Sequence, residues 1–84
     1  MMKVEVRYFA SLREALGTGE RVEVADGTTL GGLRDQLCAR GGRYAEVLSR
    51  PRPVRCALDR TMSDEATALR DGAEVAFFPP VTGG

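Results

Sequence analysis

The sequence predicts an α+β fold in which one main helix packs across one face of a small mixed sheet. Three observations carry this prediction. Two segments near the N-terminus alternate apolar and charged residues, apolar residues between positions 30 and 40 recur at helical spacing, and two more strand patterns follow. A helix with one apolar stripe must bury that stripe against another element, and a half-buried sheet offers the surface.

The N-terminal part is expected to form two strands joined by a short helix. Lys3–Tyr8 alternates strictly, with Val4 and Val6 on the same face as Tyr8, which is typical of a half-buried strand. Ala10–Gly17 has helical spacing, and its glycine can end the turn. Arg21–Val24 alternates again and runs into the turn at Asp26 and Gly27.

The main helix is predicted over Leu30–Arg40. Either Thr28 or Thr29 can cap its N-terminus. Two glycines, at positions 31 and 32, weaken its first turn by about 1 kcal/mol each relative to alanine, so tertiary packing must stabilise it. Two further glycines, at positions 41 and 42, are expected to end it. The apolar stripe consists of Leu30, Leu33, Leu37 and Cys38.

The C-terminal half supplies two further strands. One more helical turn is possible over Tyr44–Leu48, and Ser49–Pro53 is a loop because its two prolines fit neither a helix nor a central strand. Val54–Leu58 is predicted as a strand. Asp59–Arg70 is predicted to be mostly irregular, with Leu69 docked on the core. Ala73–Phe78 is the last strand, and it can lie parallel to the first at the centre of the sheet.

Composition narrows the classes of function. Eighty-four residues make one domain, too small to hold a deep active-site cavity without losing much of its core. The formal net charge of zero argues against a nucleic-acid-binding protein. Histidine is absent, and with it the usual general base and the commonest metal ligand. We therefore expect no metal site and no complete active site.

Three other features have a structural interpretation. Cys38 and Cys56 lie in apolar periodic segments and are expected to be buried, reduced core residues. Asp59, Asp64 and Glu65 resemble a carboxylate cluster, but their polar setting favours a solvated loop. The N-terminus enters strand pattern directly, without a signal-peptide core, and no segment is long enough to span a bilayer. We expect a soluble cytoplasmic protein without a membrane partner.

The sequence divides into a domain over residues 1–78 and a flexible, extended tail over residues 79–84. Val75 and Phe77 share the core face of the last strand, which leaves Phe78 partly exposed. Phe78 then either belongs to a docking surface or packs against a loop. Pro79 and Pro80 favour extended backbone and hold the residues beyond them away from the domain.

The tip of the tail is suited to chemistry performed by another protein. Val81 and Thr82 are small anchors, and Gly83 and Gly84 have no Cβ, so they can pass through a narrow channel. The carboxylate of Gly84 would be the least hindered on the protein. A carboxylate is a poor electrophile, so it must be activated, for example as an acyl-adenylate made from ATP, before it accepts sulfur or an amine.

The segment LRDGAEVAFFPPVTGG resembles the C-terminal signature of the small, sulfur-carrier subunit of molybdopterin synthase. MKVEVRYFASLREALG and VEVADGTTLGGLRDQL resemble the first strand and the main helix of the same family. The resemblance implies a β-grasp, ubiquitin-like fold. Two departures are the Gly31-Gly32 pair and Asp59, where an asparagine is expected; both concern local stability.

The resemblance also implies a reaction cycle. An E1-like enzyme would adenylate Gly84 with ATP and magnesium, and a sulfur donor would convert the tip to a thiocarboxylate. The large synthase subunit would then receive Val81–Gly84 in its active site, within a heterotetramer, and sulfur would pass to a cyclic pyranopterin precursor to form the molybdopterin dithiolene. Phe78, Pro79 and Pro80 would lie at the interface with either partner. The chain would bind no cofactor of its own.

Three alternatives remain open. A sulfur carrier for thiamine thiazole synthesis shares the fold and the Gly-Gly end, although the FFPPVTGG stem favours the molybdopterin branch. A ubiquitin-like protein modifier would use the same activated tip to form isopeptide bonds. A plain interaction module would have an inert tail, so that deletion of Gly83 and Gly84 would change nothing.

Overall fold

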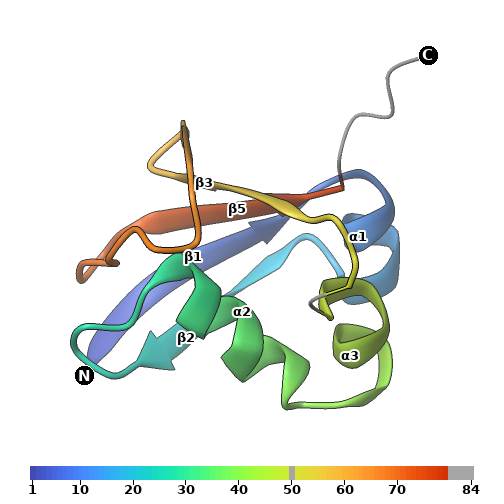
Figure 1. The fold of residues 1–84 in the computed structure, drawn as a ribbon, viewed down its shortest axis with the longest axis horizontal. Coiled ribbons are helices and arrows are strands. Elements are labelled where there is room, and N and C mark those ends of the chain that lie inside the picture. The colour runs from blue at the N-terminus through green and yellow to red at the C-terminus, as the bar shows by residue number, and fades with distance from the viewer. Residues whose placement is uncertain (50, 80–84) are drawn as a thin grey trace.

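The computed structural model describes residues 1–49 and 51–79. Within them the chain forms, in order, β1 (Met2–Tyr8), α1 (Ala10–Leu16), β2 (Gly19–Val24), α2 (Leu30–Cys38), α3 (Gly42–Leu48), β3 (Arg55–Leu58), β4 (Thr61–Ser63) and β5 (Glu74–Phe78). The described strands make one mixed sheet in the order β2-β1-β5-β3-β4. Figure 1 shows α2 and α3 on one side of this sheet and α1 at the end where β1 and β5 finish.

The last strand lies at the centre of the sheet. β5 pairs in parallel with β1, so that Tyr8 lies beside Phe77, and antiparallel with β3, so that Cys56 lies on the other side of Phe77. This confirms the expected parallel pairing of the first and last strands. Hydrogen bonding to two neighbours fixes the end of β5 firmly, and the chain leaves the sheet immediately after Phe78.

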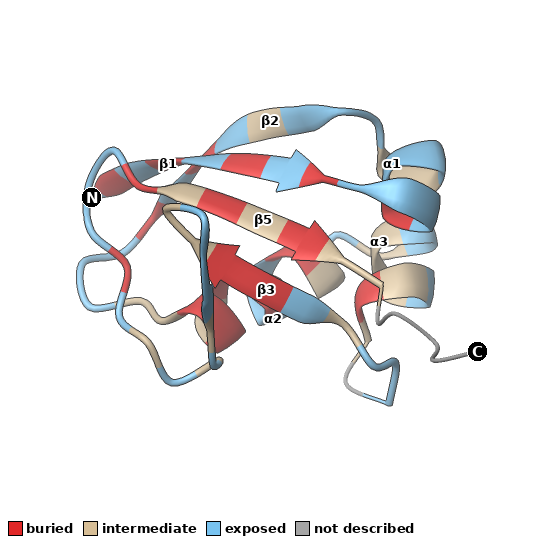
Figure 2. Cartoon of the chain, turned by 90° about the horizontal axis from the view of Figure 1, so that it is seen from above, coloured by how far each residue is buried: buried red, intermediate tan, exposed pale blue. Residues whose placement is uncertain are grey.

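The core lies between the sheet and the helices. Residues of β1 alternate between buried and exposed along the whole strand, which Figure 2 shows as alternating colours. The strands contribute Val4, Val6, Tyr8, Val75 and Phe77 to the core, and the helices contribute Leu12, Leu30, Leu33, Leu37 and Leu48. Leu69 is also buried, as expected. The two faces predicted from the alternation are therefore correct. None of the helices in the described part of the chain covers the opposite face of the sheet (Figure 1).

Local signals explain where α2 begins. The Thr29 hydroxyl accepts a hydrogen bond from the amide of Gly32 at 3.1 Å, so Thr29, of the two candidate residues, is the cap. This bond satisfies one of the donors left without a partner at a helix N-terminus. The helix ends at Cys38, two residues earlier than predicted. The glycines after it have positive φ, 77° at Gly41 and 56° at Gly42, and start α3 instead of merely ending α2.

The C-terminal half contains one strand that the sequence pattern does not predict. The segment Asp59–Arg70 is mostly irregular, as expected, but Thr61–Ser63 within it forms β4 and pairs with β3 in a hairpin. The turn between these strands consists of Asp59 and Arg60, both with positive φ, 48° and 69°. Two successive residues of this kind are typical of a type I′ turn, which usually contains asparagine and glycine.

The two cysteines behave differently from each other. Cys56 is buried as expected, and its thiol donates to the carbonyl of Ser63 at 3.5 Å. Cys38 is only partly buried, so the expectation of a core position is half correct. Both stay thiols, and burial raises the pKa of Cys56. No helix among residues 1–49 and 51–79 is long and apolar enough to cross a membrane.

Candidate functional site

The uncovered face of the sheet holds an apolar hollow at the end where the chain leaves β5. Its volume is about 880 Å³. The walls are mostly apolar and come from four places: the junction of β1 and α1, the middle of β3, β4, and the second half of β5. We use the name apolar hollow for the surface formed by Phe9, Ala10, Ala57, Met62, Ala76, Phe78 and Pro79.

Two aromatic rings form the wall next to the tail. Phe9 follows β1 and Phe78 ends β5, and their ring centroids lie 6.3 Å apart with an interplanar angle of 80°. This edge-to-face geometry is a favourable one for aromatic pairs. Phe9 is 44% exposed and Met62 is 53% exposed. An exposed apolar surface of this kind is typical of a docking site.

The structure places two of the residues predicted for the site. Phe78 is half-buried, as expected: it packs against Phe9, which follows β1, and it also lines the hollow. Its role in docking stays a prediction. Pro79 lines the same hollow. Pro80, Val81, Thr82, Gly83 and Gly84 lie outside the described residues, and their roles stay predictions. The hollow thus borders the root of the predicted tail.

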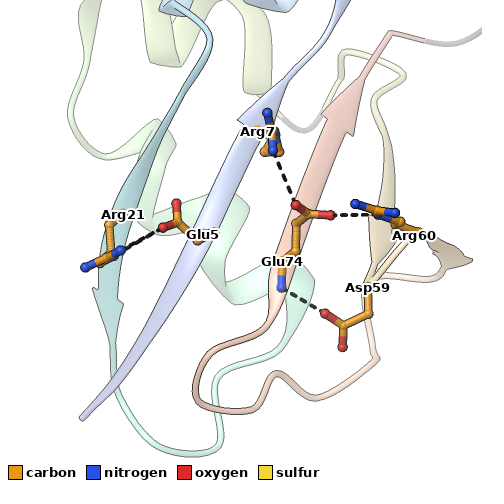
Figure 3. Close-up of polar contacts among 6 residues, drawn as sticks. All are labelled: Glu5, Arg7, Arg21, Asp59, Arg60 and Glu74. Carbon is orange, nitrogen blue, oxygen red and sulfur yellow. Dashed lines mark hydrogen bonds and ion pairs between the residues drawn. The ribbon is translucent and has the colours of Figure 1, made fainter.

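Charged residues form the rim of the hollow. The carboxylate of Glu74 lies 3.5 Å from a guanidinium nitrogen of Arg7 and 3.5 Å from one of Arg60, so it is shared between two cations. Figure 3 shows these three side chains together on the uncovered face, with Asp59 accepting from the Glu74 amide at 2.9 Å. Farther along the same face, Arg21 pairs with Glu5 at 3.0 Å. A partner that covers the hollow would therefore contact charged side chains that are already paired with one another.

A second polar cluster lies away from the hollow and stabilises the β1–β2 end of the fold. Tyr8 and Tyr44 both donate to one carboxylate oxygen of Glu20, at 3.0 and 2.9 Å, and Arg40 donates to the other at 2.7 Å. Burial works against the charge of Glu20, but hydrogen bonds from Arg40 and the two tyrosines outweigh it and hold the pKa of Glu20 below its usual value. Burial, with the neighbouring Glu20 charge, raises the pKa of Tyr8.

The three carboxylates considered from the sequence do not form a cluster of their own. Asp59 accepts from the backbone of Glu74 and pairs with Arg70, Asp64 accepts from the amide of Ala66 at 2.9 Å, and Glu65 pairs with a buried arginine. Asp59 and Glu65 therefore have structural roles, whereas the sequence favoured a solvated loop for all three carboxylates. Among residues 1–49 and 51–79 no group of acidic residues, cysteines or histidines could hold a metal ion.

Two residues of the hollow were missed from the sequence. Phe9 directly follows Tyr8 at the end of the first strand pattern, and nothing in the local sequence indicates that its side chain is exposed. Met62 stands in a segment that was predicted to be irregular. Met62 is a single large apolar residue in a polar stretch. Its position in the hollow can be inferred only once β4 is known to form the edge of the sheet. The arrangement offers an exposed apolar surface, and the charged groups at its rim are paired.

Comparisons with known proteins agree over the whole chain. The model of the ThiS family matches residues 6–84. The molybdopterin synthase sulfur carrier subunit of Mycobacterium tuberculosis is 42% identical over 86 residues, covering 100% of both chains. The subunit of the same name from Escherichia coli is 40% identical over 81 residues, which covers 96% of this chain and 99% of the relative.

Solved structures show the same fold. Small archaeal modifier protein 1 of Haloferax volcanii superposes with a TM-score of 0.81 at 25% identity, covering 96% of this chain and all of that one. Subunit 1 in the complex of subunits 1 and 2 of the molybdopterin-converting factor of Helicobacter pylori gives 0.70 at 28% identity, with 99% and 100% coverage. The ubiquitin of Caldiarchaeum subterraneum gives 0.64 at 19% identity over 99% and 98% of the chains, which establishes the ubiquitin-like fold alone.

Proposed function

This chain belongs to the ThiS family, as a molybdopterin synthase sulfur carrier subunit, and we propose that it carries sulfur as a thiocarboxylate on Gly84. The observation that carries the proposal is the apolar hollow at the root of the tail. It provides a docking surface on the carrier itself, next to the point where the reacting segment would begin. A carrier needs such a surface, because its partners must hold the domain while they act on the tip.

The proposed chemistry needs no acid or base from this chain. The carboxylate of Gly84 attacks the α-phosphate of ATP in an E1-like enzyme, pyrophosphate leaves with magnesium, and an acyl-adenylate forms. Sulfur at the sulfide level, supplied by a sulfur donor, then attacks the acyl carbon and AMP leaves, which gives a thiocarboxylate. In the large synthase subunit this sulfur bonds to the cyclic pyranopterin precursor, and water cleaves the acyl–sulfur bond and returns the Gly84 carboxylate. Two rounds give the dithiolene. A closed partner cleft protects the labile thiocarboxylate from water.

The proposed interface consists of Phe78, Pro79 and Pro80 together with the rest of the hollow. Support for this comes from position and exposure. Phe78 and Phe9 form an edge-to-face aromatic pair at this surface, and Met62 supplies a flexible apolar side chain that can adapt to different partners. Two partners would use the same surface in turn, the activating enzyme and the large subunit, in a heterotetramer of two small and two large subunits. The expected cytoplasmic location belongs to the same proposal.

The proposal is tested by intact-mass spectrometry. The protein is incubated with ATP, magnesium, its activating enzyme and a sulfur donor. We expect a mass gain equal to the replacement of one oxygen by one sulfur, located in the C-terminal peptide. An unchanged mass, with the activating enzyme shown to be active on another carrier, would leave a plain interaction module as the better description.

The variant Gly84→Ala tests the role of the tip. The change adds one methyl group at the end of the tail, so we expect unaltered thermal unfolding and a loss of adenylation or sulfur transfer of at least about tenfold, because a channel that fits glycine leaves no room for a Cβ. Lys3→Arg, which changes a charged surface residue on β1, is the matched control. Full activity of Gly84→Ala would refute the proposed narrow channel.

Protein modification is a second candidate, favoured by the similarity to small archaeal modifier protein 1. It uses the same adenylate but transfers the tip to a lysine amine. Thiamine thiazole synthesis uses the same thiocarboxylate with a different acceptor. The sulfur-charged protein, offered separately to the large synthase subunit and to a thiazole synthase, distinguishes the two sulfur pathways by which product forms. Isopeptide-linked products in a lysate would reveal modification.

A further inference from the structure

A buried arginine lies behind the root of the tail. Arg34 of α2 is 4% exposed, although it carries a full charge. Its Nε donates to the carbonyl of Leu48 at 2.6 Å, and one terminal nitrogen, Nη2, donates to the carbonyls of both Ser49 and Arg52 at 2.6 and 2.7 Å. The other terminal nitrogen pairs with Glu65 at 2.5 Å. A buried charge requires this degree of pairing.

These bonds hold three backbone carbonyls at and after the end of α3. The last carbonyls of a helix have no partner within the helix, and one guanidinium here satisfies the carbonyls of Leu48, Ser49 and Arg52. Only a planar fork of donors can reach three carbonyls and a carboxylate at once. Lysine has the same charge but presents a single ammonium on a shorter reach. Arg34 therefore does more than balance Glu65.

The fixed segment faces the root of the tail. A small hollow of about 170 Å³ lies on the helix side of the tail root, separate from the apolar hollow, and Arg52, Pro53 and Val54 line it opposite Ser11. Pro79 lines both hollows. The last described residue of the chain thus lies between the docking surface on one side and the segment held by Arg34 on the other.

We propose that Arg34 is a positioning residue for sulfur transfer, which fixes the wall of the small hollow and so sets the direction in which the chain leaves Pro79. The proposal rests on the proposed function. Arg34 lies on the helix side of the sheet and does not line the apolar hollow, so it does not contribute to docking. A tail that starts in the wrong direction would still dock but would place its reacting atom poorly.

The test separates docking from delivery in Arg34→Lys. Thiocarboxylated protein is bound to its large subunit, and we measure the Kd and the single-turnover rate constant of sulfur transfer in the saturated complex. We expect the Kd to change less than about twofold and the rate constant to fall by about ten- to a hundredfold, because small misplacements of a reacting group are costly. Hydrogen exchange of the Arg52 amide, which donates to Ser49 at 2.9 Å, should become faster.

Two further variants keep the test decisive. Thr29→Ala removes the cap at the other end of the same helix and lowers stability without touching the small hollow, so it should leave the rate constant unchanged. An equal fall in Thr29→Ala would reduce the effect of Arg34 to stability and overturn the proposal. If Arg34→Lys does not fold, Pro53→Gly loosens the wall directly, and it must lower the rate constant at constant Kd.

The proposed function and this inference fail in different ways. A wild-type protein that gains no sulfur in the mass experiment would overturn the sulfur-carrier mechanism. A wild-type protein that gains and transfers sulfur, combined with an Arg34→Lys protein that transfers it at the same rate, would overturn the positioning role alone.

Discussion

The two neighbouring phenylalanines of β5 provide the sharpest test of the fold, because they point to opposite faces of the sheet. Phe77 is 1% exposed and its ring stacks with Tyr8 at a centroid distance of 6.5 Å. Phe78 is half-buried and lines the apolar hollow. The variants Phe77→Ala and Phe78→Ala remove the same atoms from the same strand and differ only in the face that they affect.

The expected magnitudes follow from burial. Removing a fully buried phenylalanine ring costs about 3–5 kcal/mol, the sum of lost transfer free energy and a residual cavity. A domain of 84 residues has a total stability of about 4–13 kcal/mol. With a urea slope of about 1–3 kcal/mol/M, Phe77→Ala should lower the unfolding midpoint by about 1 M or more. Phe78→Ala removes a half-exposed ring and should cost about 1 kcal/mol.

Far-UV circular dichroism in urea is the appropriate assay, since the chain has no tryptophan. Binding to the large subunit is measured on the same proteins. Phe78→Ala should weaken binding while it stays folded, and Phe77→Ala should lose stability. A midpoint for Phe77→Ala equal to that of the wild type, with a large loss in Phe78→Ala, would mean that β5 faces the opposite way. Equally large losses in both variants would mean that Phe78 is buried as deeply as Phe77.

Three other predictions concern the backbone and the charged cluster. In Gly19→Ala the new Cβ would lie 2.3 Å from the carbonyl oxygen of Val6, so the strand pair must open and thermal unfolding should show a loss of about 1–3 kcal/mol. Arg60→Gly relieves a residue with a φ of 69° and should raise the free energy of unfolding by about 0.5–1 kcal/mol, seen as a higher urea midpoint. A lower midpoint would mean that the pairing of Arg60 with Glu74 matters more. The pKa of Glu20 is depressed in the folded protein, so its contribution is present above pH 4.5 and lost as the pH falls through the folded value. The stability difference between wild type and Glu20→Gln should therefore shrink between pH 7 and pH 3, and a constant difference would show that the charge of Glu20 does not matter.

The alternation of apolar and charged residues was sufficient to predict the core. Val4, Val6 and Tyr8 are buried together, as are Val75 and Phe77, because strand side chains alternate strictly between two faces. The position of β5 at the centre followed from the order of elements. These features depend on local periodicity and on simple packing rules, both of which a single sequence contains.

The missed features depend on contacts between distant residues. The β3–β4 hairpin was missed because its turn contains Asp59 and Arg60 in place of the asparagine and glycine that signal a type I′ turn. Without β4, Met62 had no assigned place, so the hollow could not be outlined. Arg34 looked like one polar residue on a helix, because its partners lie 14 to 31 positions away.

The parallel arrangement of β1 and β5 has a mechanical consequence. The paired residues run from Glu5 with Glu74 to Tyr8 with Phe77, and β3 is hydrogen-bonded to the other edge of β5. A pull on the chain beyond Phe78 acts along these strands and loads all of their hydrogen bonds at once, whereas a pull across an edge strand would break them one by one. When the tip is withdrawn from a partner's cleft, the contacts in the cleft should therefore break before β5 separates from β1 and β3. The carrier would leave folded and could be charged with sulfur again.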